Sequence, residues 1–155
     1  MRLQIKPGLR QAWRGPGTVQ IGLDPRRGTV LDGLTDADRD LLTALTTGCD
    51  AAAGGRAREL VRLLADAGVL VDSRAGRAAL ARLGPARHRL TPDAQVWSVV
   101  HPGRGDGWDL LAARTARRVE IVGAGRTGTT LAATLASAGV GQVTVRDPAP
   151  VGPGD

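Results

Sequence analysis

Several residue types are scarce in this chain, and each shortage excludes a kind of core, cross-link or metal site. Its 155 residues include three tryptophans but no phenylalanine or tyrosine, so any hydrophobic core must be aliphatic. Cys49 is the only cysteine, which excludes an intrachain disulfide and a cysteine cluster for zinc. His88 and His101 lie far apart and have no partners at metal-ligand spacing, so the sequence predicts no metal site.

Long apolar runs are also missing. Nowhere do about 18 consecutive apolar residues occur, which is the length a membrane-spanning helix needs. Residues 1–6 lack the apolar stretch of a signal peptide. We therefore expect a soluble, cytoplasmic protein with no membrane partner.

Lysine is almost absent, although the net charge is +6: of the 21 basic residues, 20 are arginine. The excess is concentrated in residues 74–118, which hold nine basic and three acidic groups. Arginine alone, beside so much alanine and glycine, favours a solvated connector over a face that binds polyanions. Nucleic acid is thus the less favoured partner.

The first half of the chain has the order of a winged helix-turn-helix. Residues 1–17 predict an irregular lead-in packed down by Trp13, while 18–23 and 28–31 predict a hairpin. Thr35 with Asp38 predicts a capping box that opens a helix ending at Gly48. The unit is completed by a second helix at 55–67, which Gly68 can end with a left-handed turn, and by a strand at 69–72.

The middle of the chain is punctuated by prolines and glycines. A third helix at 74–83, capped by Asp72 or Ser73, is followed by a proline- and glycine-rich stretch at 84–107 with a strand-like run at 95–100. Residues 108–118 then predict another helix. We expect three parts: a winged-helix-like domain at 1–83, a linker at 84–107, and the start of a nucleotide-binding domain at 108–155.

A glycine-rich turn lies in that last part. Residues 119–122 predict a short strand, 129–138 a helix and 142–145 a second strand. Between the first strand and the helix stands the pattern G-x-G-x-x-G, with residues Gly123, Ala124, Gly125, Arg126, Thr127 and Gly128.

Each glycine of the pattern has a physical purpose. Gly123 permits the tight turn, Gly125 lets backbone amides approach a phosphate, and Gly128 lets the helix pack close to the strand. Asp147, 19 residues after the last glycine, stands where a carboxylate binds ribose hydroxyls. The fold class expected is α/β: a winged-helix-like α+β domain followed by the first β-α-β unit of a Rossmann-type fold, incomplete within this chain. No catalytic residue can be assigned, since no nucleophile has a base nearby.

The run from Ile121 through the Ala-Gly-Val-Gly of residues 138–141 to Asp147 resembles the ThiF/MoeB superfamily of ubiquitin-activating-type adenylyltransferases. The resemblance covers about 37 residues. It implies ATP as cofactor, with phosphates on residues 123–128 and ribose on Asp147, and adenylation of a carboxylate at the C-terminus of a peptide or small protein; a homodimer is compatible with it. The chain departs from the pattern at Ala149, where the family has a second acidic residue, and at Gly154 and Asp155, where it has Ser-Asn. The family's magnesium-holding acidic residue would lie beyond residue 155.

The N-terminal unit resembles the PqqD-like domains that precede ThiF-type domains in proteins handling ribosomal peptide precursors. Such domains add a leader peptide as an extra strand at a sheet edge. The resemblance implies an edge at residues 69–71, with contacts from Leu60, Leu63 and Leu64; the simpler interpretation is that these leucines are core.

Two other functions stay open. A winged-helix DNA-binding regulator is supported by Arg56, Arg58 and Arg62, three arginines of the second helix that can share an exposed face. An NAD(P)-binding oxidoreductase is compatible with the glycine turn and Asp147. The leading hypothesis is part of an ATP-binding, ThiF-type adenylyltransferase engaged in peptide modification or in sulfur or cofactor biosynthesis.

Overall fold

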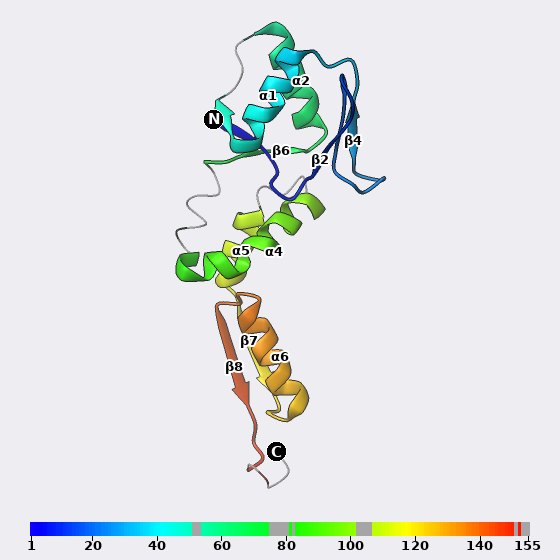
Figure 1. Cartoon of the computed structure of the whole chain (residues 1–155). Helices are drawn as coiled ribbons and strands as arrows, with labels where there is room; N and C mark the ends of the chain where they lie inside the picture. The colour runs from blue at the N-terminus through cyan, green and yellow to red at the C-terminus, as the bar shows by residue number, and fades with distance from the viewer. Residues whose placement is uncertain (51–53, 75–80, 82, 102–106, 151, 153–155) are drawn as a thin grey trace.

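The structure is a computed structural model that describes residues 1–50, 54–74, 81, 83–101, 107–150 and 152. It is a mixed α/β arrangement (Figure 1): two small sheets with two helices, then a pair of helices, then a two-stranded sheet with one helix at the far end. No helix among these residues is long and apolar enough to cross a membrane.

Two antiparallel sheets of three strands each form the N-terminal half. The first has the order β5-β1-β6 and consists of β1 (Arg2–Ile5), β5 (Cys49–Asp50) and β6 (Leu70–Asp72). The second has the order β2-β3-β4 and consists of β2 (Gln11–Gly15), β3 (Thr18–Ile21) and β4 (Thr29–Leu31). The hairpin expected at 18–31 is confirmed, with Val19 opposite Leu31.

The expectation of an irregular lead-in at 1–17 is wrong. Within β1, Leu3 and Ile5 are buried while Arg2 and Gln4 are half-buried, which is the alternation of a strand, and β1 is the central strand of its sheet. Pro7 and Gly8, which suggested irregular chain, occupy the turn that follows β1. Trp13 remains 42% exposed, with the Arg39 guanidinium 4.6 Å from the centre of its ring.

The first helix, α1 (Asp36–Thr47), begins with the expected capping box. The Asp38 N–H donates to Thr35 Oγ1 at 3.3 Å, and the Thr35 N–H donates to Asp38 Oδ2 at 2.8 Å. Gly48 ends the helix at φ 89°, a conformation that favours glycine.

The second helix, α2 (Gly55–Asp66), ends before Gly68, which has φ 69° as its sequence position predicts. The helix expected at 74–83 falls mostly outside the described residues. Asp72 Oδ1 accepts a hydrogen bond from the Arg74 N–H at 2.9 Å.

An aliphatic core joins the two helices to the sheets, as the missing aromatics predicted. Its residues are Leu3, Ile5, Val19, Ile21, Leu42, Leu45, Leu60, Leu64 and Val69. Leu64 is fully buried, so it belongs to this core and not to a surface.

The segment 84–107, expected to be irregular around a strand at 95–100, contains a long helix. After a turn of 3-10 helix, η1 (Gly84–Ala86), the helix α4 (Arg87–Val100) runs through the expected strand. Leu90, Ala94 and Ser98 are its buried residues, at the four-residue spacing of one helix face. Pro92 lies inside α4 and removes one backbone donor without ending the helix. The division of the chain into domains at this segment stays a prediction.

The helix expected at 108–118 is α5 (Gly107–Thr115), which packs directly on α4. A Cβ added to Gly107 would lie 1.9 Å from the Ala94 carbonyl oxygen, so only glycine fits there. The Gly107 N–H donates to Ser98 Oγ at 2.8 Å. Leu83, Leu90, Ala94 and Leu111 form a second small core.

A buried carboxylate links the helices of the N-terminal half. The Asp38 side chain is only 5% exposed and accepts hydrogen bonds from Arg56 Nε at 2.9 Å and from the Thr35 amide and hydroxyl at 2.8 and 2.7 Å. The Arg56 hydrogen bonds, followed by those from Thr35, hold the pKa of Asp38 far below its ordinary value.

We predict that Asp38→Ala lowers the free energy of unfolding at pH 7 by about 1.5–3 kcal/mol, the range for hydrogen bonds to a charged group. Because the pKa of Asp38 is lowered in the folded state, its contribution is complete above its ordinary pKa near 3.9 and is lost as the pH falls further. Urea unfolding at pH 7 and pH 3 measures both effects.

The matched control is Asp66→Ala, which removes an exposed ion pair with Arg62, 3.6 Å away. We expect it to cost less than about 1 kcal/mol. Equal losses for the two variants would contradict the assigned importance of Asp38.

Candidate functional site

The glycine-rich turn joins a parallel pair of strands to a helix. The strands β7 (Arg118–Val122) and β8 (Gln142–Arg146) pair in parallel, with Ile121 opposite Val145, and α6 (Arg126–Ser137) connects them. The helix starts three residues earlier than the sequence predicted. Arg126, Thr127 and Gly128 therefore form its first turn, because Gly125 is the residue that precedes the helix.

The three glycines of the turn serve different purposes. Gly123 has φ 106°, which favours glycine, and its N–H donates to the Arg146 carbonyl at 2.7 Å. A Cβ on Gly128 would lie 1.8 Å from the Gly123 carbonyl oxygen, so α6 can approach the turn only with glycine there. Gly125 has φ −62°, and a Cβ there would meet nothing within 4 Å. The fold itself therefore does not require glycine at position 125.

Open space beside Gly125 coincides with the start of α6. The first N–H groups of a helix have no carbonyl partner within the helix, and the helix dipole is positive there. Gly125 thus leaves an uncovered approach to donors that suit an anion.

Asp147 and the turn lie together, as the sequence predicted. Asp147 Oδ2 accepts a hydrogen bond from the Ala124 N–H at 2.6 Å, and Oδ1 accepts one from the Ala149 N–H at 2.9 Å. These two bonds, that from Ala124 first, lower the pKa of Asp147 and keep it ionised. Ala149, which replaces an expected acidic residue, contributes only its backbone donor.

An open pocket lies on the two strands and on the residues that follow β8. It is lined by Glu120, Val122, Val145, Arg146, Asp147 and Pro148. Arg146 Nε lies 3.0 Å from Glu120 Oε1, so these two charges meet on the sheet. Ile121 is 8% exposed and lies under α6, whereas Val122, its neighbour in an alternating strand, is 79% exposed.

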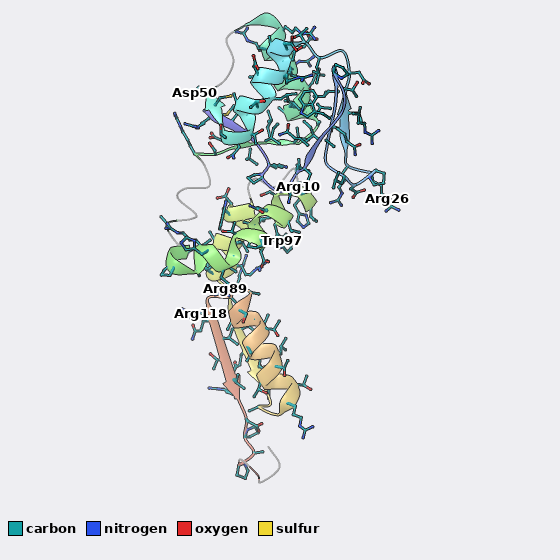
Figure 2. The ribbon with its side chains drawn as sticks, in the orientation of Figure 1. Arg10, Arg26, Asp50, Arg89, Trp97 and Arg118 are labelled. Atoms are coloured by element: carbon teal, nitrogen blue, oxygen red, sulfur yellow. The ribbon has the colours of Figure 1, made fainter. Side chains whose placement is uncertain are left out.

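The Ala-Gly-Val-Gly segment packs α6 and β8 against the α4–α5 pair. A Cβ on Gly141 would lie 1.7 Å from the Thr115 carbonyl oxygen, and one on Gly139 would lie 2.8 Å from Leu90 Cδ1. Arg114 donates to the Ala138 carbonyl at 2.9 Å. Figure 2 marks this junction by Arg89 on α4 and Arg118 at the start of β7.

Part of the arginine excess is therefore structural. Arg114 is only 23% exposed, lies 3.8 Å from Asp93, and places its guanidinium 5.4 Å from the centre of the Trp97 ring. The sequence predicted a solvated connector and gave no indication of these contacts.

A second candidate site is a groove in the N-terminal half, lined by leucines and by charged residues. It has about 520 Å³ of empty space, some of it open to solvent, and is lined by Leu31, Asp32, Leu34, Asp38, Arg56, Glu59, Leu60 and Leu63. Leu60 and Leu63 thus line this groove together with residues of β4 and of the loop that follows it, and Leu60 also belongs to the core cluster that contains Val69. Both β4 and β6 are outer strands of their sheets among the described residues.

The arginines of α2 do not form one face. Arg56 turns toward Asp38, with Nη2 2.8 Å from Asp38 Oδ2, while Arg62 pairs with Asp66 on the exposed side. Among the described residues, no group of three or more His, Cys, Asp and Glu side chains could hold a metal ion.

Comparison of the whole chain with known proteins identifies relatives of its fold. No protein-family model matches the chain, and neither does any curated protein sequence. Solved structures do match: PaaA has a TM-score of 0.72 at 20% identity, over 95% of this chain and 46% of PaaA.

E. coli MccB also matches, in crystal structures with different ligands. MccB with ATP has a TM-score of 0.59 at 14% identity, over 99% of this chain and 45% of MccB. The microcin C7 biosynthetic enzyme MccB in complex with N-formylated MccA has a TM-score of 0.60 at 13% identity, over 99% of this chain and 44% of that MccB chain. The chain thus spans less than half the length of either protein and shares the fold of that part.

We predict that Gly128→Ala destabilises the β7–α6–β8 unit, because its Cβ would collide with the Gly123 carbonyl oxygen. Overpacking typically costs about 1–3 kcal/mol, which would speed hydrogen exchange of the α6 amides roughly 5- to 150-fold. Hydrogen exchange read by mass spectrometry measures this.

Gly125→Ala is the matched control, since its Cβ meets open space at an ordinary φ. Its α6 amides should exchange at most a few-fold faster than in the parent chain, because alanine is a poorer residue than glycine before the first turn of a helix. An acceleration as large as that of Gly128→Ala would show that the fold requires glycine at position 125.

Proposed function

We propose that the chain is the peptide-recognising and ATP-binding part of a ThiF/MoeB-type adenylyltransferase that modifies a peptide. Its two candidate sites, the groove at α2 and the turn at Gly125, would bind peptide and nucleotide respectively. The observation that carries the proposal is that both sites occur in one chain whose fold matches PaaA and MccB over 95–99% of its length.

The nucleotide part of the proposal rests on the geometry of the β7–α6–β8 unit. Phosphates would lie against the turn at residues 123–128, where Gly125 leaves room and the start of α6 offers N–H donors. The ionised Asp147 would accept hydrogen bonds from ribose hydroxyls. MccB has been crystallised with ATP and with AMPCPP, which supports ATP as the nucleotide.

The peptide part of the proposal rests on a groove beside an outer strand, as in PqqD-like winged-helix domains. A peptide added at the free edge of β4 would place alternate side chains over Leu34, Leu60 and Leu63. MccB has been crystallised with MccA, which supports a peptide as the partner. In adenylation, an oxygen of the peptide carboxylate would attack the α-phosphorus of ATP and release pyrophosphate; no acid or base for this step is assigned among the described residues.

The DNA-binding alternative is weaker, because a DNA-binding face on α2 would need Arg56, which is engaged with Asp38 and the Gly33 carbonyl. The oxidoreductase alternative shares the glycine turn, so the identity of the nucleotide has to be tested.

We predict that ATP binds the chain more tightly than NAD, and that Asp147→Ala weakens ATP binding roughly 10- to 100-fold, the loss of one hydrogen bond to a charged acceptor. Isothermal titration calorimetry measures both. Asp66→Ala, an exposed carboxylate change on α2, is the control that should leave ATP affinity unchanged.

Tighter binding of NAD would favour the oxidoreductase. If neither nucleotide binds, or if Gly125→Val leaves the affinity for ATP intact, the nucleotide part of the proposal is wrong.

A further inference from the structure

We infer that the groove at α2 selects a peptide strand in which an apolar side chain and a basic side chain lie on the same face. This inference rests on the proposed peptide site and specifies the class of peptide that it takes. It follows from the distribution of charge around the groove.

One complete stripe of α2 forms a wall of the groove. Arg56, Glu59, Leu60 and Leu63 follow the spacing i, i+3, i+4, i+7, so they share one helix face. Leu63 is 46% exposed and Leu60 is 6% exposed, which places an accessible apolar surface at one end of the stripe. Leu31 and Leu34, both half-buried, face it from β4 and the following loop.

Among the described residues that line the groove, Arg56 is the only basic one, and its side chain is already engaged. Arg56 donates from Nε to Asp38 Oδ2 at 2.9 Å and from Nη2 to the Gly33 carbonyl at 2.9 Å. Its charge is balanced by the buried Asp38 carboxylate, with Nη2 2.8 Å from Oδ2. A peptide carboxylate would therefore have to compete with an internal partner that the fold holds in place.

Two carboxylates remain at the rim. Asp32 and Glu59 are both exposed, and with Asp38 they give the lining three acidic groups against one guanidinium. The groove is thus acidic in a chain whose net charge is +6. A local charge opposite in sign to that of the whole molecule attracts basic side chains and repels acidic ones.

The spacing of a β-strand suits this lining. Side chains two residues apart on a strand lie on the same face, about 6.6–6.8 Å apart. Positions one helical turn apart, such as Glu59 and Leu63, are separated by about 6 Å. For a peptide strand that runs along α2, an apolar residue over Leu63 therefore brings the side chain two positions away to Glu59.

The test uses three fluorescein-labelled decapeptides with the sequence Ser-Thr-Leu-Thr-X-Thr-Leu-Thr-X-Ser, where X is Lys, Gln or Glu. Fluorescence anisotropy with the 155-residue chain gives each affinity. We expect the Lys peptide to bind most tightly, the Gln peptide less tightly and the Glu peptide most weakly. At low salt, each affinity should differ from the next by about 2- to 10-fold, because exposed charge pairs are individually weak. The steps should shrink at 1 M salt, where the Debye length is about 3 Å.

Charge exchange isolates the residue responsible. In the Glu59→Lys variant, the Glu peptide should bind as tightly as the Lys peptide, or more tightly. Asp66→Lys makes the same change of charge on the exposed, Arg62-paired side of α2, and it should preserve the original order. If Asp66→Lys alters the order as much as Glu59→Lys does, the preference comes from overall charge and the inference is wrong.

Leu63→Gln separates this inference from the proposed function, since Leu63 is exposed enough for the variant to fold, which circular dichroism checks. It should weaken all three peptides together. Equal binding of the three peptides, lost in Leu63→Gln, would overturn the charge preference and leave the peptide groove standing. No binding of any peptide, or binding unchanged in Leu63→Gln, would overturn both.

Discussion

The geometry of the N-terminal half depends on one buried carboxylate. Asp38 closes the first turn of α1 through Thr35 and reaches Arg56 in the first turn of α2, and Arg56 also holds the Gly33 carbonyl in the loop after β4. A carboxylate that is almost fully buried costs free energy unless it is paired and hydrogen-bonded, and this one has donors on several sides. The same contacts fix α2 beside β4, so the walls of the groove are set by the requirement to satisfy a single charge.

A different constraint governs the second half, where elements meet at backbone contact. Gly107 lies against Ala94, Gly128 against Gly123, and Gly141 against Thr115, each too close for a side chain to intervene. Such approaches bring little apolar area together, which agrees with a chain that has few large side chains. They do, however, specify position sharply, because a shift of one residue would put a Cβ into a carbonyl oxygen. The glycine turn is thus one of several tight junctions between α4 and β8.

Local signals in the sequence predict the elements that depend on neighbours in the chain. The capping box at Thr35, the end of α1 at Gly48 and the meeting of Asp147 with the glycine turn follow from spacing alone. Prediction from the sequence was wrong where a residue type, such as proline, occurs both in linkers and within helices. Pro92 suggested a linker but lies within α4, whose buried face is marked by Leu90, Ala94 and Ser98.

Local signals of this kind do not predict the groove, because its walls come from segments that are distant in the sequence. Its leucines were recognised on α2, but which strand they face is decided by the Asp38–Arg56 contact between distant segments. Nothing in residues 55–67 alone distinguishes β4 from β6 as that neighbour. The fingerprint predicts that Gly125 lets a phosphate approach, but only the structure shows that the space beside Gly125 is open and that the fold itself does not require glycine there.

The alternation in β7 and β8 has a consequence for colloidal behaviour. A parallel sheet is ordinarily covered on both faces and built from continuous apolar runs. Here the face turned away from α6 carries Glu120 and Arg146 in contact, and Val122 is its exposed apolar residue. This face therefore exposes no broad apolar patch to water, which reduces the tendency of the protein to self-associate through it. Any polypeptide layer laid over it would have to supply hydrogen-bonding partners for that ion pair, so assembly onto this surface would be selective and sensitive to salt.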